Sequence, residues 1–230
     1  GMEAALYRAA DDPDGFGAAL DRAAETAVRF GTAQIAAGAH LPLVFDPASS
    51  PDVVPPAFFR EFVAPRLTRI FDAFRESGAA ANWLHIAGPA APILPYYRDL
   101  GVDLANIDYG VSPEEAVRAA PGLCFNGNIR PLDFVEAAPA AIRETSNALI
   151  QSFASRGGFI LSSGCEIPLE ASSEAVLAMT GLLWAVRHVA ASPPARPLAQ
   201  EGAPLLLNYQ GRLADPATGL PKVDGTYAIT

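Results

Sequence analysis

Positive charge is scarce in this sequence, and lysine is almost absent. Among its 230 residues, 16 are lysine or arginine and 25 are aspartate or glutamate, and Lys222 is the only lysine. The formal net charge is −9 and the sequence pI is about 4.8. Binding to nucleic acid or anionic membranes depends on clustered basic side chains. We therefore expect neither nucleic acid nor a membrane surface among the partners.

Long apolar runs and cysteines are also scarce. No run of about 18 apolar residues occurs, and no basic segment precedes an apolar one as in a secretory signal. The two cysteines, Cys124 and Cys165, are too few for a disulfide scaffold. These absences predict a soluble, cytoplasmic protein with reduced thiols.

What the sequence does contain is a repeated alternation of amphipathic helices and short apolar runs. Half of its residues are hydrophobic, which is enough for a sizeable core. From residue 13 to residue 190, spacing of apolar residues predicts helices that begin near residues 13, 56, 93, 112, 132 and 173. Between them the sequence predicts five strands, at 41–45, 82–86, 104–107, 123–125 and 159–161.

Short apolar strands separated by helices predict an α/β fold with a parallel sheet. Right-handed crossovers leave two options, an open doubly wound sheet or a (β/α) barrel. No Gly-x-Gly-x-x-Gly segment follows a strand, which is evidence against dinucleotide binding. The barrel is favoured because the polar residues of interest fall at strand ends, where barrel active sites are built. These residues are Asp46, His85, Asp108, Asn126, Asn128, Cys165 and Glu166.

The composition changes after residue 192. Four prolines between positions 193 and 204 indicate a linker, and the segments 205–213 and 224–229 read as short strands. We therefore predict two regions, a partial barrel over 1–192 and a Pro-rich linker with a short β-type tail over 193–230.

Four ordered segments resemble the uroporphyrinogen decarboxylase superfamily. They are Gln34–Pro47, Ala81–Gly88, Phe125–Pro131 and Ile160–Pro168. The resemblance covers about residues 4 to 190 and is strongest to the branch of zinc-dependent methylcobamide:thiol methyltransferases. It implies a TIM-type (β/α)8 barrel, of which this chain would supply about strands 4 to 8.

The methyltransferase resemblance implies a zinc site that binds a small-molecule thiol. One imidazole and two thiolates hold zinc in that branch, and the bound thiol is methylated by a corrinoid, which a corrinoid protein would present. His85 and Cys165 match two of these ligands, but Ala87 stands where the first cysteine is expected. A third ligand would have to come from Asp46, Asp108 or Glu166.

The decarboxylase branch is the alternative reading, with a tetrapyrrole as substrate and no metal. Its arginines come from the N-terminal part of the barrel. Those enzymes commonly carry Gly-His where this sequence has Gly164-Cys165, and an acidic-Ser pair where it has Asp46-Pro47. Across both readings we predict catalytic roles for four residues, Asp46, His85, Cys165 and Glu166. The predicted substrate-binding residues are Asn126, Asn128 and Asp108.

Simpler explanations exist for several of these residues. His85 could be a buried core histidine, Cys124 a small buried hydrophobe, and Asn126-Gly-Asn128 a tight turn between strand and helix. A second alternative to both enzymes is a non-catalytic fragment of such a barrel. Because five strands leave sheet edges open, we also predict that a second copy or the tail covers them, with a homo-oligomer as the expected state.

Overall fold

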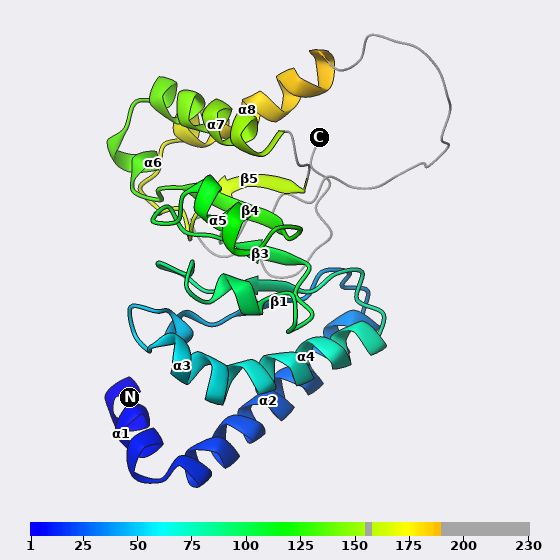
Figure 1. Cartoon of the computed structure of the whole chain (residues 1–230). Helices are drawn as coiled ribbons and strands as arrows, with labels where there is room; N and C mark the ends of the chain where they lie inside the picture. The colour runs from blue at the N-terminus through cyan, green and yellow to red at the C-terminus, as the bar shows by residue number, and fades with distance from the viewer. Residues whose placement is uncertain (155–157, 190–230) are drawn as a thin grey trace, which may run out of the picture. The chain divides into compact units, whose positions relative to one another are not determined.

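A computed structural model describes residues 1–154 and 158–189, and the side chains up to residue 181. The described chain is an α/β fold built on one sheet of five parallel strands (Figure 1). The strands are β1 (Leu43–Phe45), β2 (Trp83–His85), β3 (Leu104–Asn106), β4 (Cys124–Ile129) and β5 (Phe159–Ser163). Their order in the sheet is β1-β2-β3-β4-β5. The predicted parallel α/β sheet is therefore confirmed.

The strictly sequential strand order distinguishes between the two predicted architectures. In a doubly wound sheet the order reverses at a switch point, which lies next to the first strand. Here every strand pairs with its neighbour in sequence, as consecutive strands of a (β/α) barrel do. All carboxyl ends consequently lie along one edge of the sheet.

Pairing in register divides the strand residues between two faces. Leu84 on β2, Ala105 on β3 and Phe125 on β4 are register partners, and all three are fully buried. They pack in one apolar core with helix residues such as Phe71 and Phe153. The opposite face carries the row Phe45, His85, Asn106, Asn126 and Ile160, each paired with the next. This second row is polar in its middle and is called here the polar row.

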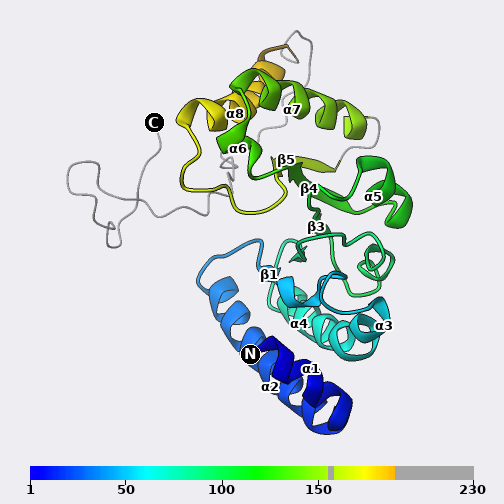
Figure 2. The ribbon, with the colours of Figure 1, turned by 90° about the vertical axis from the view of Figure 1, so that its left-hand side faces the viewer.

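The N-terminal helices are α1 (Met2–Asp11), α2 (Pro13–Ala36), α3 (Pro56–Phe58) and α4 (Ala64–Glu76), with a π-helical turn at Phe59–Val63 and a short 3-10 helix at Pro47–Ser49. Helices α2 and α4 cover the β1–β2 side of the sheet, and α1 packs against α2 (Figure 2). Asp12 caps α2 by accepting from the Gly15 backbone N–H at 2.9 Å. The Arg66 guanidinium binds both carboxylate oxygens of Asp21, which ties α4 to α2.

The C-terminal helices build a second, smaller core. After α5 (Pro113–Ala119), the helices α6 (Asp133–Glu136), α7 (Pro139–Ala154) and α8 (Ser173–Val189) follow. Ile142 and Leu149 of α7 pack with Leu161 of β5 and Ala178 of α8. The predicted linker and tail, residues 193–230, lie outside the described residues. Within the described part of the chain, no helix is both long and apolar enough to span a bilayer.

Three predicted elements were wrong in their extent. The helix predicted to begin near residue 93 is only a 3-10 turn, Leu94–Tyr96. The helix predicted to begin near residue 132 is divided into α6 and α7, because Pro139 cannot donate a backbone hydrogen bond and opens a new helix. The strand predicted to end at Phe125 continues to Ile129, so Asn126-Gly-Asn128 lies within β4 instead of forming a turn.

Candidate functional site

Side chains from three strand ends converge at the carboxyl edge of the sheet. His85 is the last residue of β2, Asp108 follows β3, and Cys165 follows β5. Burial lowers the pKa of His85 and raises that of Cys165, and the negative charge of Asp108 acts upward on the pKa of both residues. Between them, a Cβ placed on Gly164 would lie 2.8 Å from the Asp108 Oδ1 atom. Only glycine therefore lets the β5 end approach the Asp108 carboxylate this closely.

Backbone donors fix the Asp108 carboxylate. Its Oδ2 accepts from the Gly88 N–H at 2.9 Å, and its Oδ1 accepts from the Tyr109 N–H at 2.7 Å. The Asn128 amide donates to the Asp108 carbonyl at 3.2 Å and to the Val111 carbonyl at 2.7 Å. Asn128, predicted to bind substrate, thus holds the loop that carries Asp108.

The imidazole of His85 is held in its neutral form. Burial lowers its pKa, while the Asp108 charge and the Gly164 backbone partly oppose that effect. Its ring stacks obliquely against Phe45, with ring centroids 4.7 Å apart. The buried Nε2 atom has no hydrogen-bond partner among the described residues. A buried polar atom without a partner is uncommon in folded proteins and indicates a bound water, an ion or a functional role.

The thiol of Cys165 is also held in its neutral form. Burial raises its pKa, and the charges of Asp108 and Glu166 act in the same direction, whereas a hydrogen bond with the Glu166 backbone opposes them. The Cys165 carbonyl accepts from the Ser163 hydroxyl at 2.5 Å, which fixes the backbone here. In this environment Cys165 is a thiol, not a thiolate, at neutral pH.

Asp46 and Glu166 are neighbours of this cluster: the Asp46 N–H donates to the His85 carbonyl at 3.0 Å, and Glu166 directly follows Cys165. Asp46 follows β1, and its Oδ2 accepts from the Ser49 hydroxyl at 2.5 Å. Burial and the Asp46 charge raise the pKa of Tyr97, whose hydroxyl is buried without a partner among the described residues. The side chain of Glu166 is exposed. The cluster of His85, Asp108 and Cys165 is called the strand-end cluster below.

Asn106 is a site residue that the sequence reasoning missed. It lies between His85 and Asn126 in the polar row. Its Nδ2 donates to Asn126 Oδ1 at 2.7 Å, and Asn126 Nδ2 donates to the Ile160 carbonyl at 3.2 Å. The signal was available, because Asn106 stands two residues before Asp108 in an otherwise apolar strand and so shares its face.

The residues present do not make a three-ligand zinc site. His85 and Cys165 offer one nitrogen and one sulfur, and Ala87 offers no donor atom. Among the side chains that the structure describes, at 1–154 and 158–181, no three His, Cys, Asp or Glu residues are placed so that they could share a metal ion. Both oxygens of Asp108 already accept backbone hydrogen bonds. The expected third ligand is therefore not supplied by the described residues.

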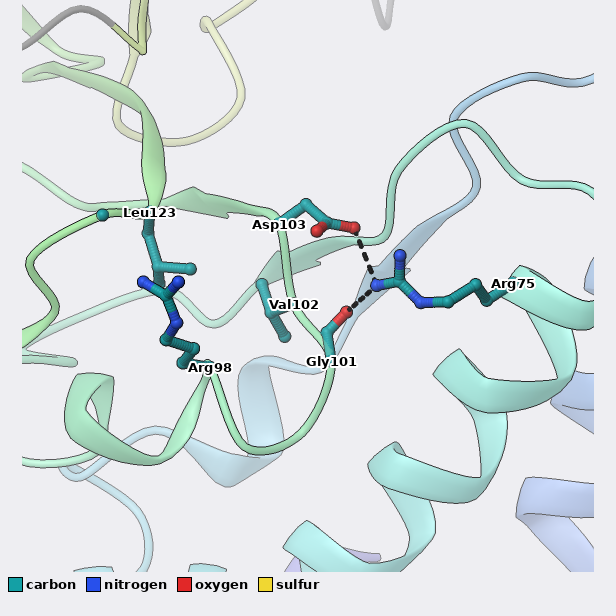
Figure 3. Close-up of a pocket in the computed structure, with 7 residues that line it drawn as sticks. Arg75, Arg98, Gly101, Val102, Asp103 and Leu123 are labelled. Carbon is teal, nitrogen blue, oxygen red and sulfur yellow. Dashed lines mark hydrogen bonds and ion pairs between the residues drawn. The ribbon is translucent and has the colours of Figure 1, made fainter.

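A cavity of about 270 Å³ lies near the opposite, amino ends of the strands (Figure 3). Asp103 and Leu123, which directly precede β3 and β4, line it together with Arg75 and Arg98. The Arg75 guanidinium donates to the Asp103 carboxylate at 3.0 Å and to the Gly101 carbonyl at 2.9 Å. None of the predicted site residues lines this cavity. In barrel folds this end of the strands serves stability.

Comparison with known proteins agrees with the sequence resemblance. A family profile described as "Uroporphyrinogen decarboxylase (URO-D)" matches residues 1–184. The uroporphyrinogen decarboxylase of Geobacillus kaustophilus is 31% identical over 154 residues, which are 66% of this chain and 43% of that protein. The "Methylated-thiol--coenzyme M methyltransferase" of Methanosarcina mazei is 32% identical over 97 residues, 42% of this chain and 25% of that protein.

The fold is also similar to a solved structure. A methyltransferase from Methanosarcina mazei superposes with a TM-score of 0.73 at 23% identity, over 81% of this chain and 54% of that one. At this identity the match shows the fold alone. These matches cover most of this chain. The chain spans only about half the length of the relatives concerned.

Proposed function

The chain belongs to the uroporphyrinogen decarboxylase family, and from this premise we propose that its strand-end cluster binds a small-molecule thiol for methyl transfer. The five strands would then be strands 4 to 8 of a (β/α)8 barrel. The sequential parallel order supports this placement. Barrel active sites lie at the carboxyl ends of strands, which is where His85, Asp108 and Cys165 meet.

One observation carries the proposal, namely the buried Nε2 atom of a half-buried, neutral His85, which has no hydrogen-bond partner among the described residues. A neutral imidazole nitrogen can accept the proton of a thiol, and Asp108 would stabilise the imidazolium that results. An ordinary thiol has a pKa of about 8.5, about 2 units above an ordinary imidazole, and burial lowers the pKa of His85 further. Full proton transfer before reaction is therefore unfavourable.

We accordingly assign His85 the role of a general base that acts as the new bond forms. The S–H bond would break as its proton moves to His85 Nε2, and the sulfur would bond to the methyl carbon of a methyl-corrinoid co-substrate. The cobalt–carbon bond of that co-substrate would break, and its electron pair would stay with the cobalt. Cys165 remains a neutral thiol and shapes the site beside the substrate sulfur. No step is assigned to zinc, because the described residues lack a third ligand.

Tetrapyrrole decarboxylation is the second candidate, favoured by the absence of a three-donor metal group among the described residues. A uroporphyrinogen decarboxylase from Arthrobacter is 29% identical over 76% of this chain. Charge is the argument against it. Asp46, Asp108 and Glu166 follow strand ends here, and the Arg130 guanidinium after β4 is bonded to the carboxylates of Asp133 and Glu136. A substrate with many carboxylates would be repelled by this edge.

The two candidates can be separated by binding to the whole chain at pH 7.5. We expect 2-mercaptoethanol to shift the His85 ring signals in NMR spectra, with the signals assigned from a His85→Gln variant. Uroporphyrin, an octacarboxylate, is expected to leave them unchanged. If uroporphyrin binds and shifts the His85 signals while the thiol does not, the decarboxylase candidate replaces the proposal.

A further inference from the structure

The polar row holds a second buried atom without a partner, next to His85. The Oδ1 of Asn106, a residue that is 4% exposed, has no hydrogen-bond partner among the described residues. Asn106 and His85 are register partners on adjacent parallel strands, so their side chains leave the same face of the sheet. Asn106 Oδ1 and His85 Nε2 are thus two buried polar atoms without partners among the described residues, on adjacent strands and on the same face of the sheet.

A chain of amides fixes which Asn106 atom is open. The Ile160 carbonyl can only accept, so Asn126 must present its Nδ2 there and its Oδ1 to Asn106. Asn126 Oδ1 can only accept in turn, so Asn106 must present its Nδ2, at 2.7 Å. The amide of Asn106 therefore cannot rotate without losing a buried hydrogen bond. Its free atom is an acceptor.

We infer that Asn106 is a specificity-determining residue and that the substrate is a thiol carrying a hydrogen-bond donor close to its sulfur. The thiol would meet His85 Nε2 while a hydroxyl or ammonium group of the same molecule donates to Asn106 Oδ1. This inference rests on the proposed function, since it names the class of thiol. The spacing of adjacent strands, about 4.8 Å, suits a donor that lies two carbons from the sulfur.

The inference predicts different binding affinities for three thiols of similar size. 2-Mercaptoethanol carries a hydroxyl donor, 1-propanethiol carries a methyl group in its place, and 2-mercaptoethanesulfonate carries acceptors only. One buried hydrogen bond contributes about 1.4 kcal/mol, a tenfold change in affinity. We expect 2-mercaptoethanol to bind about tenfold more tightly than 1-propanethiol. The sulfonate should be the weakest, because Asn106 Oδ1 and the neighbouring Asp108 carboxylate would repel it.

The test is a titration of the whole chain with each thiol, followed through the His85 NMR signals. An Asn106→Leu variant should bind 2-mercaptoethanol and 1-propanethiol equally well. Ser162→Ala is the matched control, because Ser162 pairs with Asn128 and does not adjoin Asn106. It should retain the tenfold preference.

The outcomes of this titration separate the two proposals. Equal binding of 2-mercaptoethanol and 1-propanethiol to the wild-type chain would overturn the role of Asn106 while leaving thiol binding intact. Binding of none of the three thiols would overturn the proposed function itself. The wild-type comparison requires no variant, so it stands even if Asn106→Leu fails to fold.

Discussion

At the scale of single residues, burial and charge act together on His85. Burial lowers its pKa, so the unfolded chain binds the His85 proton more readily than the folded chain does. Above about pH 6.5 both states are neutral at this residue, and its contribution to stability is complete. As the pH falls through that value and on to the lower folded pKa, the contribution is lost.

The free energy of unfolding should therefore decrease as the pH is lowered, and His85 should contribute to that decrease. Urea unfolding at pH 7.5, 6.5 and 5.5 should show stability falling with pH more steeply in the wild type than in His85→Gln. Other titrating groups are common to both chains, so the difference between the two slopes reports His85. If stability fell more steeply in the variant, protonation of His85 would stabilise the folded chain, contrary to the effect expected from its burial.

Substitution of Asp108 tests whether the strand-end cluster exists as described. Because the Asp108 charge raises the pKa of His85 and of Cys165, Asp108→Asn should lower both. The His85 pKa is measured by NMR titration. The Cys165 pKa is measured from the pH dependence of iodoacetamide alkylation in a Cys124→Ser background.

Two control variants show whether the fall in both pKa values is specific to Asp108. Glu166→Gln should lower the pKa of Cys165 alone, since Glu166 acts on Cys165 and not on His85. Asp46→Asn should lower neither, because Asp46 acts on Tyr97. If Asp108→Asn leaves either pKa unchanged, His85, Asp108 and Cys165 do not share one site.

At the scale of elements, β4 is the segment where sequence reasoning and structure diverge most. Asparagine and glycine are turn formers, so Asn126-Gly-Asn128 suggested a turn. The structure shows these residues buried and paired with Ile160, Leu161 and Ser162 of β5. Local preference was overridden by hydrogen bonds that connect β4 to segments 17 to 34 residues away in the sequence.

Gly127 is required for that strand extension. Its φ is +143°, and a Cβ there would lie 2.4 Å from the Ile107 carbonyl oxygen, a backbone atom that cannot move cheaply. Gly127→Ala should destabilise the chain by at least about 3 kcal/mol, measured by urea unfolding. Gly110→Ala is the control, since its Cβ would meet nothing within 4 Å and should change stability little. An equal effect of both substitutions would contradict this assignment.

The other elements show what sequence periodicity can and cannot predict. The helices at 13–36 and 173–189 and all five strands were predicted, because apolar spacing is a local signal. The predicted ends of the second and third strands fall within one residue of the ends of β2 and β3, whereas the end of β4 was predicted four residues too early. Asn106 was missed because its importance depends on pairing with Asn126 and His85, which lie in other strands.

At the scale of the whole molecule, the sheet leaves apolar groups exposed at both ends of the polar row. Phe45 is 49% exposed and Ile160 is 41% exposed. Among the described strands, β1 and β5 each pair on one side only. Open strand edges beside exposed apolar side chains favour association.

We therefore predict that the chain self-associates in solution. Light scattering should give a mass above the 24.0 kDa of one chain, and Ile160→Asp should shift the distribution toward the monomer. A monomer mass for the wild type, without binding of a dye for exposed hydrophobic surface, would argue against self-association.

The central claim is that His85, acting as a neutral base without zinc, binds a thiol. The most direct measurement is 2-mercaptoethanol binding to the whole chain in the presence of EDTA, compared between the wild type and His85→Gln. We predict that 2-mercaptoethanol binding survives the chelator and is lost in His85→Gln. Binding that disappears with EDTA and returns with added zinc, or that persists in His85→Gln, would contradict it.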